Sequence, residues 1–339
     1  MNLELLTSLQ SATIDITTDC NLRCRHCRLE KIRYNMSLDE IEVICKKLAK
    51  YHTNCIFVSG GEPTVRADIV DVIKLMKRYI PVITLNTNGT LLDRKLIEEL
   101  IDAGVNYFQI SLDGLEKDHN EIRGNGTFEK TINNMQILSE YSDRINIHVS
   151  SVVSLLNIDK MEDFIKFLII EKKLPLQIIG FKRYVPKNEM AGTYNLGQEG
   201  LKKLYESVEY LRDKYSDYTK IVCDFPQKNV FNAAEAWRII EKYNLKCAGC
   251  SAVSGGPAIR TDGSISPCSL LDVSYGNILT DSIEDIYESE IFQNLMDRKL
   301  EGRCGECQHK LICGGCRAVA FLLTGDYLGE DLECFILDN

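Results

Sequence analysis

The N-terminal half of the chain alternates short runs of β-branched and aromatic residues with amphipathic stretches at helical spacing. The short runs predict strands over residues 12–17, 55–59, 82–86, 107–112, 145–153 and 176–179. The amphipathic stretches predict helices over residues 37–51, where a capping box opens the helix, and over 68–78, 93–103, 128–141 and 160–171. Six β/α units indicate an α/β fold with a parallel sheet and right-handed crossovers, in which functional side chains gather where strands end.

Length and composition narrow the class of protein. A chain of 339 residues is enough for one large domain and one small one. The net charge of −9 gives no general case for nucleic-acid binding, and the sequence shows neither a signal peptide nor a membrane-spanning apolar run. Fourteen cysteines without an export signal indicate metal binding rather than disulfides. We therefore expect a cytoplasmic, oxygen-sensitive enzyme from an anaerobic setting.

Three cysteines, Cys20, Cys24 and Cys27, follow the first predicted strand. A 4Fe–4S cube normally takes four thiolates, one on each iron. Three thiolates leave one iron open for a substrate or cofactor, much as a catalytic zinc keeps one free position. The spacing alone also fits a zinc site with a distant fourth ligand, or disulfides. A second motif, Gly60-Gly61-Glu62 after the second predicted strand, favours the cluster.

These two motifs, in this order and at strand ends, resemble those of the radical S-adenosylmethionine (SAM) superfamily. The resemblance implies a partial (β/α)6 barrel in which the cysteine triplet holds a 4Fe–4S cluster and the open iron chelates SAM. It also implies that Gly60, Gly61 and Glu62 hold the SAM amino group. One electron, from an external flavodoxin- or ferredoxin-like donor, would then cleave SAM to a 5′-deoxyadenosyl radical.

The same resemblance implies further cofactor-binding residues. Asn86 ends the third predicted strand, and Ser111 and Asp113 end the fourth, at positions that lie near SAM in the family. Arg123 resembles an arginine that grips the SAM carboxylate, which suits a planar guanidinium. His26 takes the place of an aromatic residue that packs on adenine. Without the cysteine triplet, each of these motifs is equally an ordinary turn or loop.

The C-terminal region holds eight cysteines: Cys247, Cys250, Cys268, Cys304, Cys307, Cys313, Cys316 and Cys334. Eight thiolates match two fully ligated 4Fe–4S clusters, and two zinc sites would need the same number. The spacing resembles the SPASM extension of radical SAM enzymes. This resemblance assigns auxiliary cluster I to Cys247, Cys250, Cys268 and Cys316, and auxiliary cluster II to Cys304, Cys307, Cys313 and Cys334. The short spacing between Cys247 and Cys250 leaves open whether Cys247 binds or cluster I keeps an open iron.

We expect the barrel over residues 1–195, a bridging segment over 196–245 and the SPASM domain over 246–339. The three remaining cysteines are Cys45 and Cys55, which we expect in the core, and Cys223. Cys223 and Asp224 lie in the bridging segment as candidate catalytic residues. The thiol could donate a hydrogen atom to a substrate radical and the carboxylate could act as a base, although a thiol buried in a short strand would look the same.

SPASM relatives mostly modify peptides or proteins, so the resemblance implies an oxidoreductase that crosslinks, epimerises or oxidises such a substrate. The alternative is the same chemistry on a small molecule such as a tetrapyrrole side chain or a sugar. A multi-cluster electron-transfer protein is the alternative of another class. The chain begins 19 residues before Cys20, which leaves no room for a leader-peptide-binding domain and weakens the peptide interpretation. We expect substrate contacts in residues 181–186.

Overall fold

The computed structural model describes residues 9–28, 34–185, 194–243, 245–250 and 256–336. The chain forms two compact units. Unit 1 comprises Met1–Ile16, Met36–Ile56 and Phe225–Asn339, and unit 2 comprises Thr17–Asn35 and Phe57–Asp224. The expected domain ranges 1–195, 196–245 and 246–339 stay a prediction, and the two units divide the chain at other residues.

Unit 2 is built on a parallel sheet in the order β2-β3-β4-β5-β6-β7. The strands are β2 (Cys55–Ser59, which enters the unit at Phe57), β3 (Val82–Thr87), β4 (Tyr107–Ser111), β5 (Asn146–Val153), β6 (Leu176–Arg183) and β7 (Lys220–Asp224). The predicted strands are confirmed to within one or two residues, except that β6 continues to Arg183. Residues 181–183, which lie beyond the predicted strand over 176–179, are therefore part of β6.

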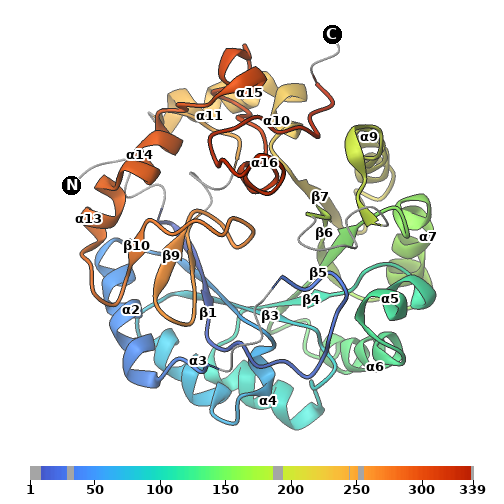
Figure 1. Ribbon diagram of the computed structural model, residues 1–339. Coiled ribbons are helices and arrows are strands. Elements are labelled where there is room, and N and C mark those ends of the chain that lie inside the picture. The colour runs from blue at the N-terminus through green and yellow to red at the C-terminus, as the bar shows by residue number, and fades with distance from the viewer. Residues whose placement is uncertain (1–8, 29–33, 186–193, 244, 251–255, 337–339) are drawn as a thin grey trace. The chain divides into compact units, whose positions relative to one another are not determined.

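The helices of unit 2 connect these strands. They are α3 (Ile69–Lys77), α4 (Arg94–Ala103), α5 (Glu116–Arg123), α6 (Thr127–Ser139), α7 (Met161–Lys166), a π-helical turn η3 (Phe167–Glu171) and α9 (Gly197–Lys214). Figure 1 shows α3, α4, α6 and α7 along the outer side of the strands. Local sequence defines their ends: Asp93 caps α4 by accepting from the Leu96 N–H, and Gly104 ends it with a left-handed φ of 113°.

The sheet of unit 2 has two unlike faces, because successive side chains along a strand point to opposite sides. Two rows of side chains in register are buried on one face: Leu85, Phe108, Ile147 and Leu176 in one row, and Ile110, Val149, Ile179 and Ile221 in the next. The opposite face, called the polar face below, carries Asn86, Gln109, Ser111, His148, Ser150, Lys182 and Asp224, all at least partly exposed. The polar face is thus the side of the sheet available to ligands.

Unit 1 combines β1 (Ser11–Asp15) with short strands from the C-terminal region. β1 pairs in parallel with β8 (Ala258–Ile259), which pairs antiparallel with β9 (Ser264–Ser266), which pairs antiparallel with β10 (Gly276–Asn277). The helices are α2 (Leu38–Lys50), α10 (Lys228–Phe231), α11 (Ala233–Tyr243), α13 (Ile283–Glu288), α14 (Glu290–Met296), α15 (Gly302–Glu306) and α16 (Arg317–Thr324). The expected capping box of α2 is confirmed between Ser37 and Glu40, and Cys45 is buried as expected.

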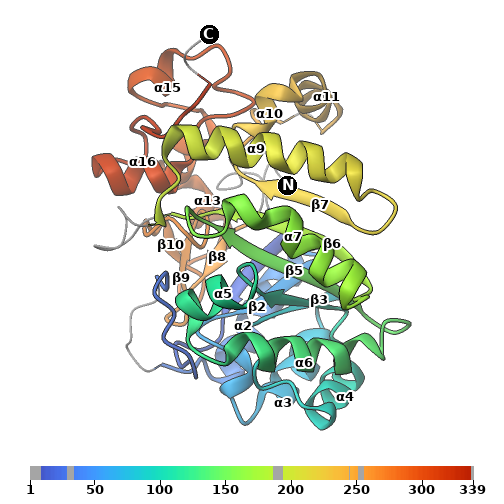
Figure 2. The same ribbon diagram turned by 90° about the vertical axis from the view of Figure 1, so that its right-hand side faces the viewer.

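α9 runs alongside β7 and packs on it, as Figure 2 shows. In the part of the chain that the structure describes, every helix is too short or too polar to span a lipid bilayer.

Candidate functional site

The loop that carries Cys20, Cys24 and Cys27 belongs to unit 2 and is fixed by backbone hydrogen bonds. Gly61 N–H donates to the Thr17 carbonyl at 2.7 Å, and Glu62 N–H donates to the Asp19 carbonyl at 2.8 Å. A Cβ at Gly61 would lie 2.2 Å from the Asp19 carbonyl oxygen, so no side chain fits there. The glycine motif and the cysteine loop are therefore held together by close backbone contact, as the two motifs at neighbouring strand ends predict.

The three thiols of this loop lie close enough to influence one another. Burial raises the pKa of the Cys24 thiol to about 11, and Cys20 and Cys27 add to this effect while Arg123 opposes it. A metal that binds such a thiol must displace its proton. Among the described residues, no three His, Cys, Asp or Glu side chains lie close enough to share a single metal ion. A 4Fe–4S cluster requires its thiolates to lie further apart than the ligands of a single metal ion, because each thiolate binds a different iron.

Glu62 is buried, and its carboxylate accepts four hydrogen bonds from the protein. Oε1 accepts from the Thr64 N–H (3.2 Å), the Thr64 hydroxyl (2.7 Å) and the Thr87 hydroxyl (2.7 Å), and Oε2 accepts from the Asn88 N–H (2.6 Å). The carboxylate thus joins the loop after β2 to the end of β3. A carboxylate has roughly four lone-pair positions, so these bonds already occupy Glu62, and its expected contact with the SAM amino group would have to share or replace one of them.

Asp113 and Arg123 form a buried ion pair beside the cysteine loop. Arg123 Nε donates to Asp113 Oδ2 at 2.6 Å, while Asp113 Oδ1 accepts from the Val152 N–H at 2.8 Å. Asp113 N–H in turn donates to His119 Nδ1 at 3.1 Å. Arg123 contacts Asp113 through Nε, and the two terminal nitrogens of Arg123 take no part in this ion pair. The expected grip on the SAM carboxylate would therefore come from those groups, with Asp113 orienting the guanidinium.

Several buried polar atoms near this pair lack a hydrogen-bond partner. Among the described residues these are His26 Nδ1 and His119 Nε2, and Asn86 Oδ1 on β3 is a further buried atom without a partner. Burial lowers the pKa of His26 to about 4, so its imidazole is neutral at physiological pH. Orphaned polar atoms in a protein interior are rare and fit a polar ligand. The residues present are thus compatible with SAM, with Ser111 nearby at the end of β4 on the polar face.

Several residues that organise this site were not predicted from the sequence. Asn88 Nδ2 donates to Asn21 Oδ1 at 2.9 Å, and Asn21 Nδ2 donates to the Thr90 hydroxyl at 2.8 Å, so the cysteine loop is tied to the end of β3. His119 Nδ1 accepts from the Asp113 N–H and so fixes the Asp113 backbone. Only their positions in the sequence mark the two asparagines: Asn21 lies within the cysteine motif, and Asn88 directly follows Thr87 at the end of β3.

The two candidate catalytic residues Cys223 and Asp224 point away from each other. Both lie on β7, where neighbouring side chains alternate between faces. Cys223 is buried in register with Phe181, and its thiol contributes to the raised pKa of Tyr205 on α9, for which burial is the larger cause. Asp224 is exposed on the polar face, in register with Lys182. The structure does not bring the two together, and burial of Cys223 near α9 fits a packing role.

The C-terminal cysteines of unit 1 form two groups. Burial first, and then the Cys250 and Cys316 thiols, raise the pKa of Cys268 to about 12. Burial likewise raises the pKa of Cys334 to about 11, with contributions from Cys304 and Cys307. Cys313 belongs to this second group through Cys304 and Cys334. The groups coincide with the expected ligands of auxiliary clusters I and II, apart from Cys247, whose thiol donates to the Met296 carbonyl at 3.6 Å.

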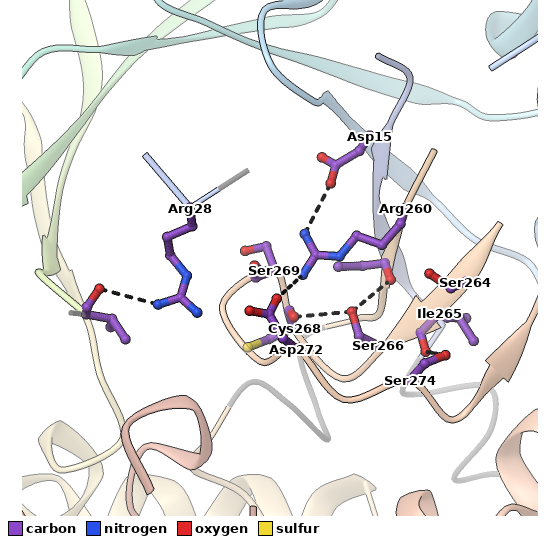
Figure 3. Close-up of polar contacts among 12 residues, drawn as sticks. Asp15, Arg28, Arg260, Ser264, Ile265, Ser266, Cys268, Ser269, Asp272 and Ser274 are labelled. Carbon is purple, nitrogen blue, oxygen red and sulfur yellow. Dashed lines mark hydrogen bonds and ion pairs between the residues drawn. The ribbon is translucent and has the colours of Figure 1, made fainter. Parts of the chain in front are cut away.

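The loop of Cys268 is held in unit 1 by Arg260, as Figure 3 shows. Arg260 Nη1 lies 3.3 Å from Asp15 Oδ2, and Nη2 donates to the Ser269 carbonyl at 3.1 Å and lies 3.4 Å from Asp272 Oδ1. Nothing in the sequence distinguishes these residues from ordinary surface charges. Only the pairing of β1 with β8 brings Asp15 next to Arg260.

Comparison with known proteins gives two family matches. The profile of the radical SAM superfamily matches residues 14–168, and the profile of SPASM, an iron–sulfur cluster-binding domain, matches residues 241–308. An AdoMet-dependent heme synthase of Methanosarcina barkeri is 27% identical over 94% of both chains. A probable GTP 3′,8-cyclase of Methanocaldococcus jannaschii is 30% identical over 80% of this chain and 89% of its own. A pre-heme d1 synthase of Dinoroseobacter shibae is 24% identical over 95% of this chain and 85% of its own.

Among solved structures, one titled "Native anSMEcpe with bound AdoMet" superimposes with a TM-score of 0.73. It is 18% identical and covers 96% of this chain and 93% of its own. At this identity the likeness shows the fold, which agrees with the expected α/β architecture.

Proposed function

Because the chain belongs to the radical SAM superfamily and carries a SPASM domain, it is an enzyme of SAM radical chemistry, and we propose that it modifies an acidic side chain of a tetrapyrrole. When bound, SAM and its 4Fe–4S cluster supply a radical that removes a hydrogen atom from an unactivated carbon. The observation that supports a tetrapyrrole substrate is the similarity to an AdoMet-dependent heme synthase over 94% of both chains. The resemblance to SPASM enzymes favours a peptide or protein, whereas the similarity to a heme synthase favours the small-molecule alternative.

The cofactor-binding roles are part of the proposal. Cys20, Cys24 and Cys27 would hold the first cluster, and the two C-terminal groups would hold two auxiliary clusters, three in all. The backbone of Gly60 to Glu62 would hold the SAM amino group and Arg123 its carboxylate. The orphaned atoms of His26 and Asn86 support a polar ligand at this place. An external flavodoxin- or ferredoxin-like protein would supply the electron.

Cationic side chains of unit 2 support an acidic substrate. Arg28 follows Cys27 directly, and its Nη1 donates to the Val185 carbonyl at 3.4 Å, just beyond β6 (Figure 3). Lys182, near the end of β6, lies on the polar face, whereas Arg183 beside it is buried on the opposite face, in register with Val153. Guanidinium groups bind carboxylates with two parallel hydrogen bonds. The segment expected to contact substrate therefore brings positive charge next to the cysteine loop. Pro186, its last residue, lies outside the described residues.

The substrate class is tested with the reconstituted, reduced protein and SAM. We expect iron coproporphyrin III, which carries carboxylate side chains, to stimulate formation of 5′-deoxyadenosine and to change in mass. Iron octaethylporphyrin has the same macrocycle without carboxylates and serves as the matched control. If 5′-deoxyadenosine forms equally with both porphyrins and neither changes in mass, the tetrapyrrole proposal is refuted. Stimulation by candidate peptides instead would reinstate the peptide interpretation.

A further inference from the structure

Arg317, the first residue of α16, is an arginine completely buried beside the C-terminal cysteines. Its Nη1 donates to the carbonyls of Tyr327 (3.1 Å) and Gly329 (2.6 Å), and its Nη2 donates to Cys304 Sγ at 3.5 Å. Its Nε is buried and has no hydrogen-bond partner among the described residues. Among the described residues, no carboxylate forms an ion pair with the Arg317 guanidinium. Its hydrogen-bond partners among the described residues are thus a sulfur and two carbonyl oxygens.

A second buried guanidinium shows the same pattern nearby. Arg298 is 2% exposed, and its Nη2 donates to the carbonyl of Ala248, in the loop between Cys247 and Cys250. Its Nε and Nη1 are buried without a partner among the described residues. Two buried arginines of unit 1 that form no ion pair among the described residues point to a shared cause, because an unpaired buried charge is strongly destabilising.

The loop between Cys313 and Cys316 is shaped around these two side chains. Gly314 and Gly315 both have left-handed backbone, with φ of 71° and 62°. A Cβ at Gly315 would lie 2.7 Å from Arg317 Nη2 and 3.0 Å from Cys304 Sγ, and a Cβ at Gly314 would lie 2.6 Å from Arg298 Nη1. Glycine at both positions therefore lets each guanidinium approach the cysteine loop directly.

An iron–sulfur cluster supplies the missing negative charge. A 4Fe–4S cube with four thiolates is a net anion, and its sulfur atoms accept hydrogen bonds. Cys304, whose Sγ accepts from Arg317, belongs to the group formed with Cys307, Cys313 and Cys334. The residues present therefore fit an anionic cluster better than they fit an apolar or cation-binding core.

We propose that Arg317 sets the reduction potential of auxiliary cluster II, through its N–H bond to the Cys304 thiolate and its buried positive charge. The proposal rests on the proposed function, since it requires the cluster. Reduction adds one electron to the cluster, so a fixed positive charge beside it stabilises the reduced form more than the oxidised form. Hydrogen bonds to the sulfurs act in the same direction. Arg317 acts through the cluster and touches no substrate.

The test is a redox titration of the full-length, reconstituted protein with dithionite, followed by electron paramagnetic resonance of the auxiliary clusters. Cys24→Ala serves as the background, because it removes the signal of the first cluster. We expect Arg317→Gln to lower the equilibrium constant for reduction of cluster II at least tenfold, about 59 mV for one electron. Arg317→Lys keeps the charge and should restore part of this loss.

The matched control is Arg303→Gln. Arg303 precedes Cys304 directly, but its side chain is 46% exposed and pairs with Glu330 at 3.0 Å, so solvent and the carboxylate screen its charge. We expect this control to leave the potential within roughly threefold of the wild-type equilibrium constant. A potential that is equal in Arg317→Gln and wild type, at equal iron content, overturns the proposal.

A second measurement covers the case in which Arg317→Gln loses the cluster. In wild-type protein grown with isotopically labelled arginine, electron–nuclear double resonance of reduced cluster II should detect a guanidinium nitrogen. Absence of that coupling overturns the proposal without any variant. A wild-type protein that binds no auxiliary cluster would instead refute the cluster assignment of the proposed function.

Discussion

Replacing Asp113 by Asn tests the buried ion pair beside the cysteine loop. Asn is nearly the same size but has one oxygen where Asp113 has two, so it can accept from the Val152 N–H or from Arg123 Nε, and its NH2 group then faces the other donor. Arg123 then stays buried, with a side chain only 9% exposed, and loses its carboxylate partner. Removal of one member of a buried pair costs about 3–5 kcal/mol. We expect at least about 3 kcal/mol, because the single Asn oxygen serves only one of the two donors and the negative charge is lost.

The assay must report on unit 2 alone. The single tryptophan, Trp237, lies in unit 1, so its fluorescence does not follow this site. Hydrogen exchange read by mass spectrometry on peptides from β4 and α5 is local instead. A loss of about 3 kcal/mol accelerates exchange roughly a hundredfold wherever exchange requires this region to open.

The control for this prediction is Asp102→Asn, which breaks an ion pair of similar length on the surface. Arg144 Nη2 lies 2.7 Å from Asp102 Oδ1, but the two side chains are 48% and 70% exposed. An exposed pair is worth about 0–1 kcal/mol, so exchange should change less than roughly fivefold. Equal and small effects of the two substitutions would refute the account of a buried, charge-compensated Asp113.

The stability that the Asp113 carboxylate contributes depends on pH in a definite direction. Burial alone would raise the pKa of Asp113, but Arg123 and His26 together bring it below its ordinary value. A carboxyl with a lowered folded-state pKa stabilises the fold above its unfolded pKa of about 3.9 and loses this effect as the pH falls further. The advantage of wild type over Asp113→Asn should therefore persist at neutral pH and shrink below about pH 4.

The remaining predictions concern the clusters and their surroundings. Anaerobic reconstitution should load about twelve irons and twelve sulfides per chain, and a value near four would mean that the C-terminal cysteines bind something else. Gly61→Ala should disrupt the cysteine loop, because its Cβ would lie 2.2 Å from the Asp19 carbonyl oxygen, and the first cluster should then be lost while the auxiliary iron remains. If Cys223 donates a hydrogen atom, Cys223→Ala should keep all clusters and cleave SAM but fail to form the normal product. Normal turnover by that variant would leave Cys223 a packing role only.

The strands and the cofactor motifs could be predicted because their signals are local. Alternating and apolar runs identified the strands, and the cysteine spacings identified both cluster regions. β6 is the exception: Gly180 and the charged residues Lys182 and Arg183 look like loop residues. The strand continues there because β5 and β7 pair with it on both sides, which no local pattern reveals.

The partners of buried charges could not be predicted, because they depend on how the folded chain places the side chains and not on a local pattern. Arg123 looked like a ligand for SAM, but its nearest carboxylate is Asp113 of the same site. Arg317 looked like an ordinary residue after a cysteine motif, and only its complete burial singles it out. Cys223 and Asp224 are neighbours in sequence, yet the alternation of β7 sends their side chains to opposite faces.

The most direct test of the central claim is SAM cleavage by wild type and by Cys24→Ala, each reconstituted and reduced under the same conditions. The account predicts 5′-deoxyadenosine with wild type and none with the variant, which should retain its auxiliary iron, because the first cluster has only three protein thiolates and cannot lose one. Formation of 5′-deoxyadenosine by Cys24→Ala, or its absence with fully loaded wild type, would contradict the account.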